Sequence, residues 1–299
     1  KEETYADVSP VRLNSNGVSA FVSITRGCDN MCTFCVVPFT RGRERSREPK
    51  SILEEIKQLN SQNYKEITLL GQNVDSYLWY GGGLKKDFKN ASEIAKTTAV
   101  GFAELLDMVA IAFPKMRIRF STSNPQDMNL NVIHTMAKHK NICNYIHLPV
   151  QSGSTSVLKR MNRQHTREEY LELIDTIKTI IPLEYVKYDF GFMFAYSERP
   201  GTPAAKKMED DIPLAIKKRR LAEIILVQQK HSLYHLEQFI GKTVEILIEG
   251  SSKKSDAHWK GRNSQNAVAV FPKGNEKIGD FVNVYIENCT SATLLGKRV

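Results

Sequence analysis

Three cysteines stand close together near the start of the chain, in Arg26-Gly27-Cys28-Asp29-Asn30-Met31-Cys32-Thr33-Phe34-Cys35. Cys28, Cys32 and Cys35 span only eight residues, so they are too close to link distant parts of a fold but well placed to bind one inorganic centre. Thiolates are soft ligands, and three of them favour zinc or an iron–sulfur cluster. The first chemistry that this sequence predicts is therefore that of a metal centre.

Zinc and an iron–sulfur cluster make different demands on the rest of the chain. Structural zinc sites normally close with a fourth protein ligand, whereas Cys143 and Cys289 each stand alone in the sequence. A cubane cluster with three cysteine ligands keeps one iron open. A zinc loop completed by a distal Cys or His stays open at this point, and with it the alternative of a zinc-stabilised, non-catalytic RNA-binding protein.

The sequence around these cysteines resembles a known family. The spacing Cys-x-x-x-Cys-x-x-Cys, with Phe34 just before the last cysteine and an apolar strand before the first, resembles the radical S-adenosylmethionine (radical SAM) enzymes. The following Val36-Val37-Pro38-Phe39-Thr40-Arg41-Gly42-Arg43-Glu44-Arg45-Ser46-Arg47 is similar to the radical SAM methylthiotransferases that modify tRNA, in the branch that forms 2-methylthio-isopentenyladenosine. The resemblance implies a [4Fe-4S] cluster on Cys28, Cys32 and Cys35.

The same resemblance implies that SAM binds the open iron through its amino and carboxylate groups, with further contacts from strand ends. A glycine-rich motif at the second strand end receives the SAM amino group in these enzymes, and Gln and Asn supply carbonyl acceptors there. A backbone near the last cysteine faces the adenine, and an arginine could pair with the carboxylate. The residues that we expect to contact SAM are Phe34, Gly71, Gln72, Asn73, Ser123, Gln151 and Arg163.

The elements that must position these residues alternate between strand and helix. Residues 18–25 alternate and hold several β-branched side chains, which predicts a strand that delivers Cys28 at its carboxyl end. Pro49 begins a helix with apolar residues at helical spacing. Further strands are predicted at 66–71, 117–123, 145–150 and 188–196, and helices at 102–113, 132–138 and 167–181. This order predicts an α/β fold with a mostly parallel sheet, and the resemblance implies a partial (β/α)6 barrel.

That count gives five strands where the radical SAM barrel has six. The chain runs directly from the helix at 167–181 through residues 183–187 to the last strand. About one strand–helix unit is therefore expected to be missing near 183–187, either by deletion or because it is disordered and not among the printed residues.

The carboxyl-terminal part of the chain has a different sequence pattern. We expect a lead-in at 1–17, the radical SAM core at 18–210, a long amphipathic connecting helix at 211–238 and a small all-β, OB-like domain at 239–299. The last resembles the TRAM domain, an RNA-binding module. It holds nine Lys and Arg against six Asp and Glu from 238 onward, and Lys260 and Arg262 are expected RNA contacts.

Charge supports an RNA partner. The formal net charge is +9, and a basic protein gains affinity for a polyanion by releasing its counterions. Arg41, Arg43, Arg45 and Arg47 lie beside the cysteines, and guanidinium groups suit bidentate phosphate contacts. Some of the four could instead pair with Glu44 or Glu48 and brace the loop.

The resemblance implies a transferase that adds a methylthio group to isopentenyladenosine beside the anticodon of tRNA. Sibling enzymes act on threonylcarbamoyladenosine in tRNA or on an aspartate of a ribosomal protein. In the family an auxiliary [4Fe-4S] cluster in an amino-terminal domain, not found in these residues, carries the sulfur; one SAM methylates it and a second is cleaved to a deoxyadenosyl radical. A flavodoxin- or ferredoxin-type electron donor, a monomeric state and a cytoplasmic location are expected.

Overall fold

The structure is a computed structural model that describes residues 16–181 and 190–299. The chain divides into two compact units, one of residues 1–182 and 199–208 and the other of residues 183–198 and 209–299. No helix in the described part is both long and apolar enough to span a bilayer.

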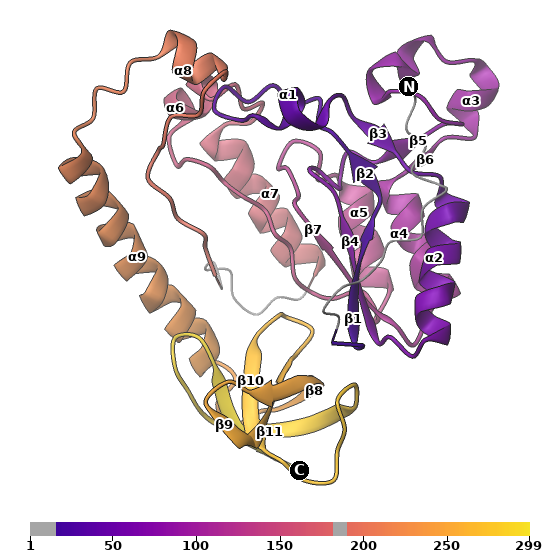
Figure 1. The fold of residues 1–299 in the computed structure, drawn as a ribbon, viewed down its shortest axis with the longest axis vertical. Helices are drawn as coiled ribbons and strands as arrows, with labels where there is room; N and C mark the ends of the chain where they lie inside the picture. The colour runs from indigo at the N-terminus through magenta and orange to yellow at the C-terminus, as the bar shows by residue number, and fades with distance from the viewer. Residues whose placement is uncertain (1–15, 182–189) are drawn as a thin grey trace. The chain divides into compact units, whose positions relative to one another are not determined.

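The first unit is built on a three-stranded parallel sheet in the order β1 (Ser19–Ser23), β4 (Glu66–Leu70) and β7 (Arg117–Ser121), seen in Figure 1. The register places Ser23, Leu70 and Ser121 side by side. Because the strands are parallel, their carboxyl ends meet at one edge, which is where open α/β sheets carry their sites. The predicted strands at 18–25, 66–71 and 117–123 are confirmed.

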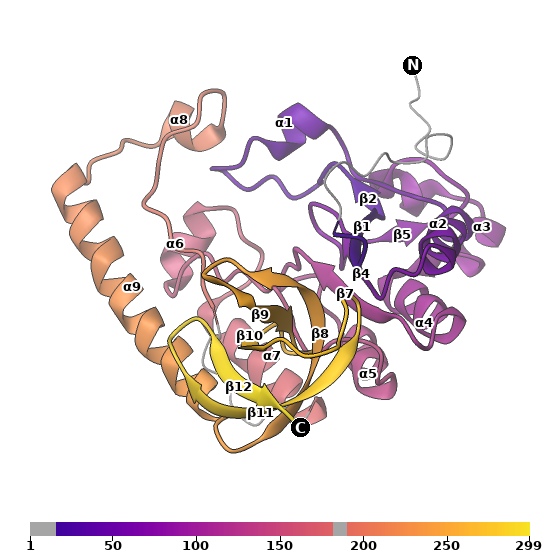
Figure 2. The ribbon, with the colours of Figure 1, turned by 60° about the horizontal axis from the view of Figure 1, so that its bottom comes forward.

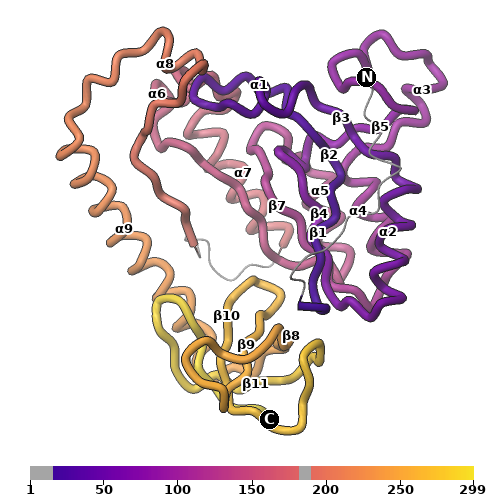
Figure 3. The backbone as a smooth tube through the Cα atoms, viewed as in Figure 1, coloured from indigo at the N-terminus to yellow at the C-terminus, as the bar shows by residue number. Residues whose placement is uncertain are grey.

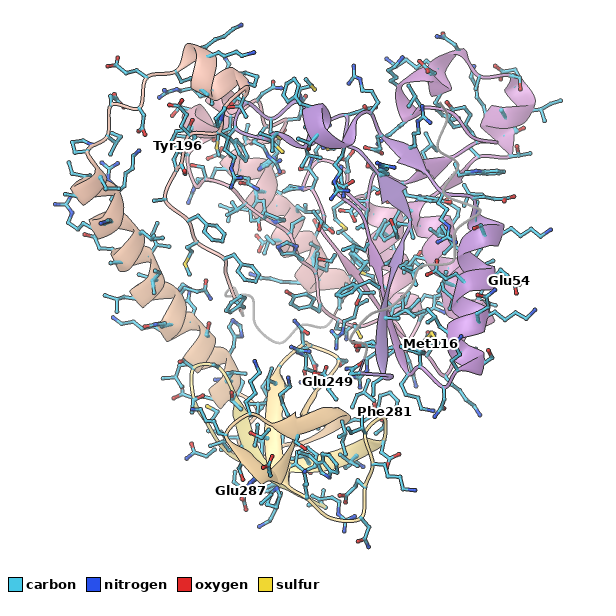
Figure 4. The ribbon with its side chains drawn as sticks, in the orientation of Figure 1. Glu54, Met116, Tyr196, Glu249, Phe281 and Glu287 are labelled. Carbon is cyan, nitrogen blue, oxygen red and sulfur yellow. The ribbon has the colours of Figure 1, made fainter. Side chains whose placement is uncertain are left out.

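Helices cover the sheet and contact one another in chain order: α2 (Pro49–Ser61), α4 (Phe102–Ala112), α5 (Leu130–Lys138) and α7 (Arg167–Ile180). Ile52, Ile56 and Leu59 recur at helical spacing and are buried. Glu54 lies on the opposite side of α2 and points into solvent (Figure 4). The α/β fold class is therefore confirmed, with three strands in the main sheet of the described part of this unit.

Short elements connect these layers. Residues 76–98 include one short strand, a 3-10 helix and one short α-helix, and this unit also holds two short antiparallel strand pairs. Their bounds are β2 (Thr25–Arg26), α1 (Val37–Arg41), β3 (Arg45–Ser46), β5 (Leu78–Trp79), the 3-10 helix Lys85–Asn90, α3 (Glu93–Thr97), β6 (Val100–Gly101), α6 (Thr155–Arg160) and α8 (Pro203–Lys207).

The predicted strand at 145–150 is wrong. The chain runs beside β7 but pairs with it only at separated points: Ile118 and Ile142 form an isolated bridge, and Ser123 N donates to His147 O at 3.0 Å. Residues 145–150 themselves form no strand. The β-branched composition favours extended backbone, but a strand also needs a continuous ladder of partners.

The predicted strand at 188–196 is also wrong for its described part, 190–196, which forms no strand and belongs to the second unit. Phe190, Phe192 and Phe194 are exposed at alternate positions, as on a strand, yet no neighbouring strand pairs with them among the described residues. Alternation predicts an extended conformation but cannot supply a partner. The missing unit expected near 183–187 lies outside the described residues.

The second unit holds the long helix α9 (Leu214–Glu237), as the sequence predicts, and a closed five-stranded barrel (Figure 2). The strand order is β10-β12-β11-β8-β9, with bounds β8 (Thr243–Ser252), β9 (Ser255–Arg262), β10 (Val268–Pro272), β11 (Phe281–Cys289) and β12 (Leu294–Arg298). The barrel core is fully buried: Ile246, Ile248, Ala269, Phe271, Val284, Ile286 and Leu294. A Cβ on Gly261 would lie 2.1 Å from Leu247 O, so only glycine fits at this position, where β9 pairs with β8.

Candidate metal centre

The cysteine loop follows β2 and folds back onto the start of β3. Gly27 has a φ of +74°, and a Cβ there would lie 2.3 Å from Arg43 O, so the turn requires glycine. Cys28 N donates to Gly42 O at 3.2 Å, and Ile24 N donates to Leu70 O at 2.9 Å. The loop is thereby fixed at the carboxyl ends of the strands, the position that the sequence predicts for Cys28.

A second set of hydrogen bonds fixes the other side of the loop. Thr33 N donates to Met161 O at 3.1 Å, Thr33 Oγ1 to Arg160 O at 3.1 Å, and Asn162 Nδ2 to Met31 O at 2.8 Å. Ala204 N, in α8, donates to Thr33 O at 2.8 Å. In Figure 3 the tube of α6 and that of α8 lie beside the loop that precedes α1. The loop is therefore held from the sheet and from the α6 end.

The three thiols differ in exposure. Cys28 and Cys32 are buried and Cys35 is partly exposed. Burial, with smaller effects from Glu44 and the two neighbouring thiols, raises the pKa of Cys28 to about 11. Without a metal this thiol keeps its proton, and a metal must displace it on binding.

No group of three His, Cys, Asp or Glu side chains in the described residues is spaced to hold one metal ion. A cubane places its three thiolates on three different irons and so requires a wider spacing than a single ion does. Polar atoms without a partner lie at the same edge of the sheet as the cysteine loop: Thr25 Oγ1, Gln72 Oε1 and Asn73 Oδ1 are buried and have no hydrogen bond among the described residues. A Cβ on Gly71 would lie 2.0 Å from Thr25 Oγ1. Three thiols beside unsatisfied acceptors fit a cluster with an ammonium-bearing ligand.

The end of β7 carries a hydrogen-bond network that the sequence did not reveal. Ser123 Oγ donates to Asp75 Oδ1 at 3.0 Å, and Asn124 N donates to Asp75 Oδ2 at 3.2 Å. Burial raises the pKa of Asp75 to about 8. Ser123 thus uses its hydroxyl inside the protein. The feature that could have identified Asp75 is an acidic residue two positions after Asn73, in a segment whose residues are buried.

Arg163 is an expected SAM contact whose side chain donates a hydrogen bond to a cysteine. Its Nη1 donates to Cys32 Sγ at 3.3 Å and its Nη2 to Asn124 Oδ1 at 2.8 Å. One pocket is lined by Asp29, Asn30, Met31, Cys32, Asn124, Gln126, Asn162, Arg163 and Gln164. Of the expected SAM contacts, only Arg163 lines this pocket. Phe34, Gly71, Gln72, Asn73 and Ser123 lie outside its lining, as does Gln151, which is exposed with a φ of +65°.

The four arginines of the loop have different surroundings. Arg41 and Arg45 are exposed, and Arg43 Nη1 lies 3.3 Å from Asp29 Oδ1 with about half of its side chain exposed. Arg47 is mostly buried, forms an ion pair with Glu55 and donates from Nε to Ser51 Oγ at 3.0 Å. Arg47 therefore braces β3 against α2 and does not belong with the three arginines that can face phosphate.

The acid expected to share the bracing role makes other contacts. Glu44 is buried, accepts from Ser76 Oγ at 2.6 Å and lies 3.5 Å from Lys85 Nζ. Burial raises the pKa of Glu44.

In the second unit, the two expected RNA contacts lie on β9 beside a carboxylate, Glu249, which Figure 4 labels. Arg262 Nη1 lies 2.8 Å from both oxygens of Glu249, and Lys260 Nζ lies 4.0 Å from Oε2. Lys273 Nζ lies 4.4 Å from the centre of the Trp259 ring. Arg262 and Lys260 thus both lie beside the carboxylate of Glu249.

Comparisons with known proteins agree with this division. Residues 22–189 match the model of the radical SAM superfamily, and residues 237–299 match that of the TRAM domain. The tRNA-2-methylthio-N(6)-dimethylallyladenosine synthases of Christiangramia forsetii and Flavobacterium johnsoniae are 66% and 63% identical to the chain. Each alignment covers all of this chain and 68% of the relative.

Two further comparisons concern length and fold. The alignments extend over 325 positions against 299 residues here, so the relatives hold at least 26 positions (325 minus 299) without a counterpart. Among solved structures, methylornithine synthase matches with a TM-score of 0.40 and 14% identity over 68% of this chain and 61% of its own. That likeness is too low to support an argument.

Proposed function

We propose a function for this chain from the premise that it belongs to the radical SAM superfamily and, within it, to the tRNA-2-methylthio-N(6)-dimethylallyladenosine synthases. It is a radical SAM transferase that acts on tRNA and adds a methylthio group to dimethylallyladenosine, the isopentenyladenosine expected from the sequence. The observation that carries the chemistry is the cysteine loop: three thiols held at the carboxyl edge of the sheet beside buried acceptors without partners.

Cys28, Cys32 and Cys35 would hold the [4Fe-4S] cluster. When bound, the cluster and SAM supply the hydrogen-abstracting radical chemistry that protein side chains lack. The protein's part is to bind and orient. Gln72 Oε1 and Asn73 Oδ1, both buried and without a partner among the described residues, can accept N–H bonds from the SAM ammonium group.

The remaining contacts with SAM are proposals of the same kind. Gly71 lets the backbone pass close to Thr25, since a Cβ there would lie 2.0 Å from Thr25 Oγ1. The backbone at Phe34 would face the adenine, and Ser123, Gln151 and Arg163 would complete the site from neighbouring strand ends. Of these proposed SAM contacts, Arg163 is the best supported, because it lines the pocket beside Cys32.

For tRNA we propose two contact regions. Arg41, Arg43 and Arg45 would contact phosphates of the anticodon loop near the metal centre, while Lys260 and Arg262 would contact the RNA from the barrel. A TRAM domain on the same chain supports an RNA-binding role for the second unit.

The other expected partners stay proposals. They are a flavodoxin- or ferredoxin-type electron donor and an auxiliary [4Fe-4S] cluster held by the amino-terminal domain of the family. The chain is proposed to act as a monomer in the cytoplasm, where reduced thiols suit metal binding.

The test measures SAM cleavage by the protein reconstituted with iron and sulfide. Alanine at Cys28, Cys32 or Cys35 should abolish 5′-deoxyadenosine formation and remove iron, because each replacement deletes a ligand. Cys143→Ala and Cys289→Ala are the controls and should retain both. Cleavage retained in Cys32→Ala would refute the ligand assignment.

A second measurement tests the substrate. SAM cleavage should be stimulated more by tRNA that carries dimethylallyladenosine than by the same tRNA without the dimethylallyl group or with threonylcarbamoyladenosine. Equal stimulation by all three would contradict the substrate assignment while leaving the metal centre in place.

A further inference from the structure

A guanidinium group links the cysteine loop to the end of β7. Arg163 Nη1 donates to Cys32 Sγ at 3.3 Å, and its Nη2 donates to Asn124 Oδ1 at 2.8 Å. Its Nε is buried and has no partner in the described residues. The cationic head group is thus shared between a sulfur and an amide rather than paired with a carboxylate.

Asn124 is itself held on three sides. Its backbone N–H donates to Asp75 Oδ2 at 3.2 Å, and its Nδ2 lies 3.3 Å from Asp127 Oδ2. Asp127 also accepts from Asn73 Nδ2 at 2.6 Å. The amide that receives Arg163 is therefore tied to the ends of both β4 and β7, so the guanidinium has little freedom to leave the sulfur.

The backbone near Arg163 is fixed to the same loop. Asn162 Nδ2 donates to Met31 O, and Met161 O accepts from Thr33 N. These bonds lie on either side of Cys32 in the sequence. The distance from the guanidinium to this thiol is thus set by backbone contacts as well as by the side chain.

We propose that Arg163 is a positioning residue that orients the Cys32 thiolate and raises the reduction potential of the cluster bound to it. The proposal rests on the cluster assignment made above. Reduction adds negative charge that is spread over the cluster and its thiolates, and a cationic N–H donor stabilises the reduced form more than the oxidised form. Hydrogen bonds to ligand sulfurs are among the features that set such potentials.

The test is potentiometry of the reconstituted chain without SAM, followed by electron paramagnetic resonance. Arg163→Gln should shift the midpoint potential to a more negative value than that of the parent protein. Arg163→Lys keeps the charge but cannot donate to Cys32 and Asn124 in the same geometry. Its midpoint potential should therefore fall between those of the parent protein and Arg163→Gln. Arg160→Gln is the matched control: it removes an exposed arginine from the end of α6 and should leave the midpoint unchanged.

Asn124→Ala keeps Arg163 but removes the amide that holds its guanidinium group at the sulfur. This variant should therefore also lower the midpoint potential. This variant decides the question if Arg163→Gln fails to retain iron. An unchanged midpoint in whichever variant holds the cluster would overturn the proposal. Weaker SAM binding by Arg163→Gln at an unchanged midpoint would likewise overturn it and assign Arg163 to the SAM carboxylate alone. A parent protein that forms no reducible cluster would refute the proposed function itself.

Discussion

At the residue scale, burial decides which ionisable groups matter. Glu54 and Glu55 are adjacent in α2, yet Glu54 is exposed and Glu55 is buried with Arg47. Likewise Asp75 lies inside the first unit, where it accepts hydrogen bonds from Ser123 and Asn124. Neither role can be read from residue type alone.

Asp75 should make stability depend on pH. Burial raises its pKa from 3.8 to about 8 in the folded protein, so between these values the folded state holds a proton that the unfolded state releases. The contribution of Asp75 to stability is therefore greatest below pH 4 and declines as the pH rises toward 8.

Asp75→Asn should remove that decline, because the amide is neutral at every pH and its oxygen can still accept from Asn124 N. Urea unfolding of both proteins at pH 5, 6.5 and 8 is the measurement. The parent should lose stability relative to the variant as the pH rises. A constant difference across the three pH values would contradict the assignment.

At the element scale, the arginine segment between the cysteines and α2, residues 41–47, places its guanidinium groups in two different environments. Arg43 and Arg45 keep exposed guanidinium groups, whereas Arg47 fixes β3 to α2 through Glu55 and Ser51. The three arginines stand at every second position, yet only Arg47 is turned toward the interior.

Changing Arg43 and Arg45 together to Gln should weaken tRNA binding and reduce its dependence on salt, while iron content and tRNA-free SAM cleavage stay near those of the parent.

Arg47→Gln should instead lower stability by about 3 kcal/mol or more, since it removes one partner of a buried ion pair. Filter binding at several salt concentrations and urea unfolding separate the two variants. Iron loss in the Arg43/Arg45 variant equal to its loss of binding would argue against phosphate contact.

At the scale of the whole molecule, the two units suggest a division of labour. The first holds the cysteines and the strand ends, and the second holds a barrel with a complete core of its own.

Deleting residues 241–299 should lower tRNA affinity and flatten its salt dependence, because basic side chains of the barrel would no longer replace counterions on phosphates. SAM cleavage without tRNA should persist, since the cysteine loop and its supports lie in the first unit. Unchanged tRNA affinity after the deletion would move the RNA contact to the arginine segment.

Much of the architecture follows from local sequence. Apolar residues at helical spacing predict α2, α7 and α9, and the sequence pattern after residue 238 predicts the small all-β domain, because the period of burial is visible in consecutive residues. The strands that failed, at 145–150 and 190–196, had the right composition and lacked a continuous neighbour.

The three cysteines and their spacing could be predicted from the sequence alone, since they lie within eight residues and need no distant segment to bring them together. Tertiary structure decided the contacts of Arg163, which meets Cys32 across 131 residues, and the choice of Arg47 as an internal brace. Both depend on which side chains the fold brings together in a region of low solvent exposure. Residue type fixes what a side chain can donate or accept, but only packing fixes its partner.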